Sequence, residues 1–216
     1  MSSRTAAAPG QRTGFKGLVT GVAALALVGV MAWDTKVVTI GSDEDVQADV
    51  FSAESFGAEE FPRVRSVIED KAAEAPALAE AIEADKDAAV EQYGTPSGIA
   101  PVMSVSFTGT VGEGKSGIFD VAVDGMPDDT RIRVQTGPAI NGTDLRDAPG
   151  DIAFGQFTNQ IEYQNAGAAL NNEMKVEVLE GLDREALTGK TVTVTGVFRL
   201  INPANWLVTP VRFEVQ

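Results

Sequence analysis

The fold is indicated most clearly by Met103–Gln135, MSVSFTGTVGEGKSGIFDVAVDGMPDDTRIRVQ, in which apolar residues recur at every second position in three successive runs. Alternation with a period of two is typical of strands that bury one face. Turn-forming residues separate the runs at Gly112–Gly117 and Asp124–Asp129. We therefore predict three half-buried strands joined by two turns. The apolar positions of these strands are Met103, Val105, Phe107, Phe119, Val121, Val123, Ile132 and Val134.

A helix and two further strands are predicted downstream. Asn165–Leu182 has apolar residues at helical spacing, and Thr191–Leu200 and Trp206–Val215 have strand-like patterns. Three strands, a helix and two strands form the element order of the OB-fold, a five-stranded Greek-key barrel, although other α+β sheets share this order. The predicted fold class for residues 102–216 is therefore α+β, an OB-like β-barrel with a helix between strands three and four.

Three residues in the predicted strands fit the bends of such a barrel. Gly109 lies in the first strand and Gly196 in the fourth, where a closed sheet has to bend. Pro210 lies in the last strand, and because proline has no N–H to donate, it is expected at an edge or a bulge.

Residues 34–94 are predicted to form a juxtamembrane segment and a small helical subdomain. Pro62 is placed in the first turn of one helix, Pro76 at the start of a second, and Asp85 at the cap of a third. A Pro- and Gly-containing linker, 95–101, is predicted to separate these helices from the barrel. The apolar positions of the first helical pattern are Phe61, Val64, Ile68, Ala72 and Ala75.

Composition excludes several function classes. The chain has no Cys and no His, which removes disulfides, thiolate nucleophiles, Ser-His-Asp catalysis and the usual zinc sites. Its net charge of -14 is opposite in sign to that needed to bind a phosphate backbone, so nucleic acid is not an expected partner. Ser42–Gly94 alone holds 15 acidic and 4 basic residues. A solvated outer helix face explains this excess better than a docking surface for a basic partner.

An apolar segment near the N-terminus predicts a membrane anchor. Gly17–Trp33 contains 17 residues without a charge, at the short end of the range for a membrane-spanning helix. Residues 1–16 form a basic tail, predicted to be cytoplasmic, and Asp34 follows the segment, so the C-terminal domain is expected outside the cytoplasm. We expect a single-pass protein of the bacterial cytoplasmic (inner) membrane. A signal peptide cleaved after Val30-Met31-Ala32 is the alternative.

The densest polar chemistry lies in Gly137–Met174, between the third strand and the helix. A fixed polar segment on a rigid scaffold is a usual place for recognition, because amides offer both donors and acceptors. We predict a ligand- or partner-binding site there, with a small polar ligand as one possibility. The candidate residues are Asn141, Thr143, Arg146, Asp147, Thr158, Asn159, Gln160, Glu162 and Asn165.

Four carboxylates of the same segment raise the question of catalysis or cation binding: Asp144, Asp147, Asp151 and Glu162. Their spacing matches no known metal loop, and turn caps and salt bridges to Arg146 account for them more simply. No catalytic residue, metal or cofactor is assigned. The protein is therefore expected not to be an enzyme.

Gly109–Ser116, GTVGEGKS, matches the pattern of a nucleotide-binding phosphate loop. Such a loop requires a helix to follow, whereas the period after Ser116 is that of a strand. A hairpin turn is the favoured interpretation.

Several motifs together resemble a known family: TGPAINGTDLRDA, FGQFTNQIEYQNAGAALN, LTGKTVTVTGVF, DTKVV and LVTPVRFEV. They are similar to the bacterial domain-of-unknown-function family 2291 of predicted periplasmic lipoproteins. The resemblance implies a small helical subdomain followed by an OB-like barrel, a periplasmic location, and genes often found beside those of sugar ABC transporters. It implies no established activity. The chain departs from the lipoprotein pattern because it has no Cys to acylate, which leaves attachment to Gly17–Trp33.

Three functions follow from these observations, in order of preference. The first is a non-catalytic binding or accessory protein on the outer face of the cytoplasmic membrane, associated with a sugar ABC-transport system. The second is a structural protein of the cell envelope, in which the polar residues satisfy one another. The third is a carboxylate-dependent hydrolase.

Overall fold

The computed structural model describes residues 20–21, 25–31 and 51–216. Residues 51–216 form one compact unit. Residues 20–21 and 25–31 are helical, and the rest of the predicted anchor, Gly17–Trp33, lies outside the described residues, as do the basic tail 1–16 and residues 34–50. Within the described residues, no helix combines the length and the apolar character needed to cross a membrane.

Five strands close into a ring. They are β3 (Val102–Lys115), β4 (Ile118–Ala122), β5 (Arg131–Gln135), β6 (Thr191–Arg199) and β7 (Asn205–Val215). The pairing runs β3–β4–β5–β7–β6 and returns to β3, with only β5–β7 parallel among these five. Two short strands, β1 (Ala73–Glu74) and β2 (Gly94–Thr95), pair with β3. The five-stranded OB-like barrel predicted from strand periodicity is confirmed.

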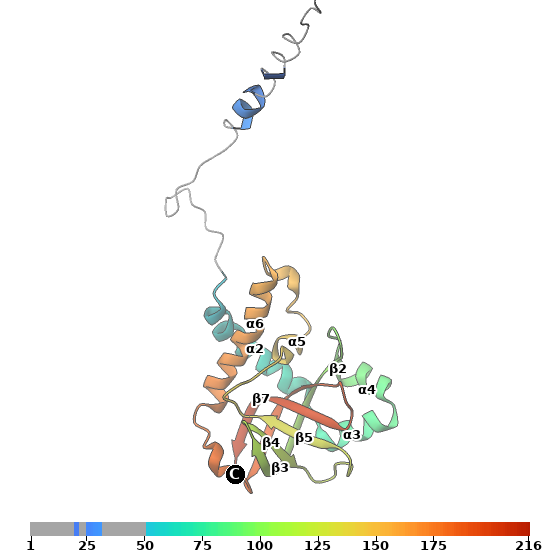
Figure 1. The fold of residues 1–216 in the computed structure, drawn as a ribbon. Helices are drawn as coiled ribbons and strands as arrows, with labels where there is room; N and C mark the ends of the chain where they lie inside the picture. Colours follow the sequence, from blue (N-terminus) through green and yellow to red (C-terminus); the bar gives the residue numbers. More distant parts are fainter. Residues whose placement is uncertain (1–19, 22–24, 32–50) are drawn as a thin grey trace, which may run out of the picture. The chain divides into compact units, whose positions relative to one another are not determined.

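Helices cover this barrel (Figure 1). They are α2 (Ala53–Lys71), α3 (Ala75–Ala84), α4 (Lys86–Tyr93), the single turn α5 (Asp144–Asp147) and α6 (Gln160–Met174). A π-helical turn, Lys175–Leu179, continues α6, which lies between strands three and four of the barrel as predicted. Two 3-10 turns lie at Phe154–Gln156 and Arg184–Ala186.

The two predicted bends are present. β3 pairs with β6 as far as Thr110 and with β4 from Thr110 onward, so the strand changes partner directly after Gly109. A Cβ at Gly109 would lie 2.5 Å from the carbonyl oxygen of Ala122. At Gly196 the β6–β7 register shifts, and Pro210 lies opposite it. The proline therefore occupies an irregularity in the ladder, as its missing N–H requires.

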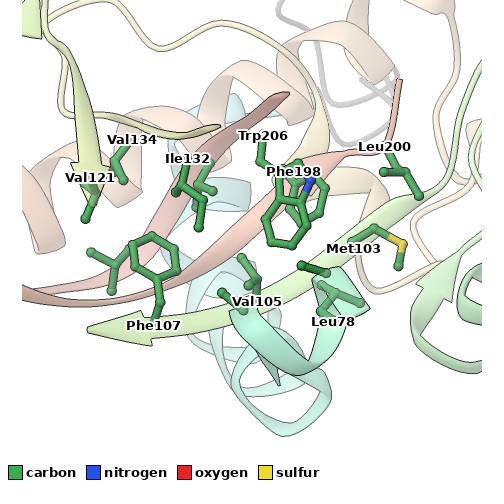
Figure 2. Close-up of a cluster of buried hydrophobic side chains, with 14 of the residues drawn as sticks. Leu78, Met103, Val105, Phe107, Val121, Ile132, Val134, Phe198, Leu200 and Trp206 are labelled. Atoms are coloured by element: carbon green, nitrogen blue, oxygen red, sulfur yellow. The ribbon is translucent and has the colours of Figure 1, made fainter. Parts of the chain in front are cut away.

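One hydrophobic core fills the barrel. The inward positions of β3, β4 and β5 supply Met103, Phe107, Val121 and Ile132, and Figure 2 shows them converging on the side chains of β6 and β7. We call this cluster the inner core, and its other members include Leu78, Val105, Val134, Val194, Phe198, Leu200, Trp206 and Val208. Burial of this apolar surface is the main stabilising term of the barrel.

Trp206 is the largest fully buried side chain of the inner core. Its ring stacks on Phe198 at a centroid distance of 4.4 Å, and its indole N–H donates to the Pro203 carbonyl at 2.7 Å. The buried ring therefore packs against another aromatic side chain, and its indole N–H has a hydrogen-bond acceptor.

A second core lies between α2, α5, α6 and the outward face of the barrel. Val102 and Val197 point from the strands toward Phe61, Ile68 and other apolar residues of the helices. The helices α2 and α6 pack so closely that a Cβ at Gly57 would lie 2.9 Å from the Ala169 carbonyl oxygen. Because successive side chains of a strand point to opposite faces of the sheet, the same strands contribute to both cores.

The helix predictions are partly corrected. Ser52 caps α2 by accepting from the Ser55 N–H at 3.2 Å, so the helix starts at Ala53 and Pro62 lies inside it rather than in its first turn. Pro76 lies in the first turn of α3, and Asp85 caps α4 through the N–H groups of Asp87 and Ala88, both as predicted. The phosphate-loop pattern lies on the β3–β4 hairpin and is followed by a strand, as predicted.

We expect Gly109→Ala and Gly196→Ala each to lower the free energy of unfolding by about 1–3 kcal/mol, since the added methyl meets a backbone carbonyl of a paired strand. Gly181→Ala is the matched control, because a methyl there meets no atom within 4 Å. Urea denaturation of the three variants measures the difference. Equal unfolding midpoints for all three would show that the barrel does not need glycine at its bends.

Candidate functional site

The polar segment leaves the barrel through a fixed point at the end of β5. The buried Gln135 amide donates to Thr209 Oγ1 of β7 at 2.8 Å, and its Oε1 accepts from the Asn141 N–H at 3.4 Å. Thr136 donates from both its N–H and its hydroxyl to the Gly117 carbonyl, at 2.7 and 3.0 Å. The start of the segment is therefore held by β7 and by the β3–β4 hairpin.

The carboxylate of Asp147 is the centre of a nearly buried polar network. One oxygen accepts from Thr143 Oγ1 at 2.8 Å, Ser97 Oγ at 3.0 Å and an Arg199 terminal nitrogen at 2.7 Å. The other accepts from Arg146 Nε at 2.8 Å. We call the set Ser97, Thr143, Asp144, Arg146, Asp147 and Arg199 the Asp147 cluster.

Arg199 joins β6 to two other segments at this cluster. From the end of β6 it donates to Asp144 at 3.0 Å, to Asp147 at 2.7 Å and to the Ala100 carbonyl at 3.1 Å. Its side chain is only 17% exposed, and those of Asp144 and Asp147 are 14% and 10% exposed. At such low exposure an ion pair depends on complete hydrogen bonding to offset the loss of solvation.

Arg146 connects the same cluster to α6. Its guanidinium lies 3.7 Å from the centroid of the Tyr163 ring and donates to the Tyr163 carbonyl at 3.0 Å. The residue is 7% exposed, and it pairs with Asp147, whereas Asp144 pairs with Arg199. The expected salt bridge to Arg146 is therefore present for Asp147, whereas Asp144 pairs instead with the distant Arg199.

The two aspartates of the cluster have pKa values shifted in opposite directions. Burial acts to raise the pKa of Asp147, but hydrogen bonds from Arg199, Thr143 and Arg146 together hold it below its ordinary value. Burial raises the pKa of Asp144, and the attraction of Arg199 compensates only in part.

A second group of the predicted site residues caps α6. Asn159 accepts from the N–H groups of Ile161 and Glu162 at 2.9 and 3.0 Å, and Glu162 accepts from the Thr158 N–H at 2.9 Å. This arrangement resembles a capping box and starts the helix at Gln160, five residues before the predicted start at Asn165. Thr158, Asn159 and Gln160 are exposed.

The predicted site residues therefore fall into separate places. Thr143, Arg146 and Asp147 belong to the Asp147 cluster, Thr158 to Glu162 form the cap, and Asn141 is exposed ahead of both. Asn165 lines a groove of about 530 Å³ on the exposed side of α6 and the start of α2. The remaining lining residues are Ala53, Glu54, Ala168, Ala169, Asn172, Glu173 and Val176.

The four carboxylates do not share one partner. Asp144 and Asp147 pair with Arg199, Asp151 pairs with Arg63 at 2.8 Å, and Glu162 caps α6. In the part of the chain that the structure describes, no group of three or more Asp or Glu side chains is arranged to hold a metal ion.

Sequence reasoning missed three residues that organise the segment. Arg199 and Ser97 complete the Asp147 cluster from 52 and 50 positions away, and the buried Asn171 donates to the Gly142 carbonyl at 2.9 Å. The alternation of β6 places Arg199 on the same outward face as Val197, but no local signal identifies its partners.

The geometry defines an OB-fold barrel whose polar connection is folded inward around a charged cluster. The chain matches the sequence model of the family DUF2291, predicted periplasmic lipoprotein, over residues 20–214. It therefore belongs to this family, which has no established function. No curated protein matches the chain.

The fold also matches a solved structure. The crystal structure of an OB-fold protein from Thermotoga maritima superposes with a TM-score of 0.62 at 19% identity, covering 77% of this chain and 99% of that one. At this identity the similarity establishes the fold alone.

We expect Arg199→Met to lower the free energy of unfolding by about 3–5 kcal/mol, because it leaves the nearly buried Asp144 without its cation and Asp147 with Arg146 alone. The matched control is Arg212→Met, since Arg212 pairs with Glu69 and Glu214 but is 50% exposed; there we expect a loss of about 1 kcal/mol or less. Chemical denaturation compares the two. Equal losses would contradict a central role for the cluster.

We expect Asp147→Asn and Asp144→Asn to change the pH dependence of stability in opposite directions. The lowered pKa of Asp147 gives stability that is present above its unfolded pKa, about 3.9, and is lost as pH falls through the folded value, so Asp147→Asn should flatten the acid-side decline. The raised pKa of Asp144 gives stability present below its unfolded pKa that is lost as pH rises through the folded value. Urea midpoints between pH 2 and 7 test both signs, and slopes that change in the same direction would refute this assignment.

Proposed function

We propose that the protein is a non-catalytic binding or accessory protein held on the outer face of the cytoplasmic membrane. The observation that carries the proposal is that each carboxylate suited to chemistry in the polar segment already has a structural partner. This use of the carboxylates argues against the carboxylate-dependent hydrolase.

The state of Asp147 supports the same conclusion. A general base works best when its pKa lies near the operating pH, and the pKa of Asp147 is instead lowered. All four of its hydrogen bonds come from protein donors, two of them from guanidinium groups. Such a carboxylate stabilises a fold more readily than it accepts a substrate proton.

The surface best suited to a partner is the exposed side of α6. Its groove presents the amides of Asn165 and Asn172 beside the apolar Val176, which is 56% exposed. Amides both donate and accept hydrogen bonds, so they suit a polar protein surface or a hydroxyl-rich ligand. Of the predicted binding residues, Asn165 is the one that lines this groove.

The family description and the charge pattern support the proposed location. The family is described as predicted periplasmic lipoproteins, and this chain has no Cys for acylation. Attachment is then assigned to the uncharged segment Gly17–Trp33, with the preceding basic residues on the cytoplasmic side. A sugar ABC-transport system is the partner that the family resemblance implies.

The second candidate is a structural envelope protein. It is favoured by the inward hydrogen bonding of the Asp147 cluster, because residues that satisfy one another need no ligand. The two functions differ in whether the groove on α6 has an occupant.

We expect the full chain to fractionate with the cytoplasmic membrane and to be digested by protease from the periplasmic side. A photo-cross-linker at Asn165 or Asn172 should capture a membrane-associated protein, because these residues line the groove, whereas one at the exposed Lys86 of α4 serves as control. Mass spectrometry of the cross-linked material tests the proposal. Identical capture from all three positions would leave the structural function as the better account.

A further inference from the structure

A second open surface lies on the outward side of β4 and β5. A hollow of about 400 Å³ is bordered by the β3–β4 hairpin and by both strands. Phe119, Val121, Ile132 and Val134 belong to the inner core or pack against it. By the alternation of strand side chains, Asp120 and the two arginines of β5 face outward into the hollow. The full lining is Glu113, Gly114, Lys115, Ser116, Ile118, Asp120, Arg131 and Arg133.

This hollow gathers positive charge on a strongly acidic protein. Lys115, Arg131 and Arg133 line it with two acids, Glu113 and Asp120, whereas the chain as a whole has a net charge of -14. The lining therefore has a net charge of +1, and a cation without an acidic partner in it can attract an anion from solution.

The pairing within the hollow leaves one arginine available. Asp120 lies directly opposite Arg133 in the β4–β5 register, yet its carboxylate pairs with the diagonal neighbour Arg131, at 2.7 Å from a terminal nitrogen. Arg133 donates from Nε to Asn205 Oδ1 at 3.1 Å. Within the described residues its two terminal nitrogens and the Lys115 ammonium have no protein partner.

These contacts also fix the position of Arg133. It lies on a strand rather than on a loop, and the Asn205 side chain at the start of β7 holds its Nε. A guanidinium held in this way presents two parallel N–H groups, which match the two oxygens of a carboxylate or phosphate. Lys115, at the end of β3, supplies a second charge from the hairpin side.

We propose that this hollow binds a small molecule that carries one anionic group on a hydroxylated carbon skeleton. The terminal nitrogens of Arg133 bind the anion and Lys115 adds its charge, while the Ser116 hydroxyl can both donate to and accept from a ligand hydroxyl. The surface corresponds to strands two and three of the OB-fold and to the loop between strands one and two, where this fold commonly binds its ligands.

The site uses none of the residues of the α6 groove. It therefore goes beyond the proposed partner contact, and either can fail without the other. A carboxylate and a phosphate share the required chemistry, so the test includes one ligand of each kind.

The test is calorimetric titration of the full, detergent-solubilised chain with glucuronate, with glucose 6-phosphate, and with glucose as the neutral control. We expect saturable binding of glucuronate, glucose 6-phosphate or both, and none of glucose. Arg133→Gln should weaken this binding about tenfold or more, because glutamine lacks the charge and the paired N–H groups. Lys115→Ala should weaken it several-fold.

Lys86→Ala is the matched control, since Lys86 is exposed on α4 and does not line the hollow. It should leave binding unchanged, and thermal melts should show that all three variants fold. Three results would each overturn the proposal: no binding of either anion, equal binding of glucose, or the same loss for Lys86→Ala as for Arg133→Gln.

Discussion

The pairing of Arg199 with Asp147 is the interaction on which the arrangement around the barrel depends. It joins the end of β6 to α5 at 2.7 Å, and through Ala100 and Ser97 it also holds the connection that leads into β3. Arg146 extends the same network to Tyr163 of α6. A single charged cluster thus holds the polar segment, the linker and a helix against a barrel whose own core is apolar.

Low exposure of these charges explains why the segment is so polar. A carboxylate removed from water loses its solvation, and only a full set of donors compensates. Asp147 obtains four donors from Ser97, Thr143, Arg146 and Arg199. Much of the amide and hydroxyl chemistry that suggests recognition in the sequence therefore satisfies buried charges and a helix end.

The barrel could be predicted because its determinants are local. Alternation identifies the inward residues of β3, β4 and β5, and Gly109, Gly196 and Pro210 mark its irregularities. The predicted start of α6 at Asn165 is wrong, because the residues that cap the helix, Asn159 and Glu162, have the same polar character as a binding loop. The Asp147 cluster was only half predicted, since Arg199 lies 52 residues from Asp147 and periodicity carries no information about such pairs.

The same distinction between satisfied and unsatisfied groups separates the surfaces that can act from those that hold the fold. Residue type does not make this distinction, because Arg146 and Arg133 are both arginines that lie close to an aspartate in the structure. Arg146 is 7% exposed, with its charge matched by Asp147 and by the Tyr163 ring and carbonyl. Arg133 instead lines an open hollow beside an acid that is already paired with Arg131. Because a binding site needs groups that the protein has left free, a small anionic ligand suits the outward face of β4 and β5 better than it suits the Asp147 cluster.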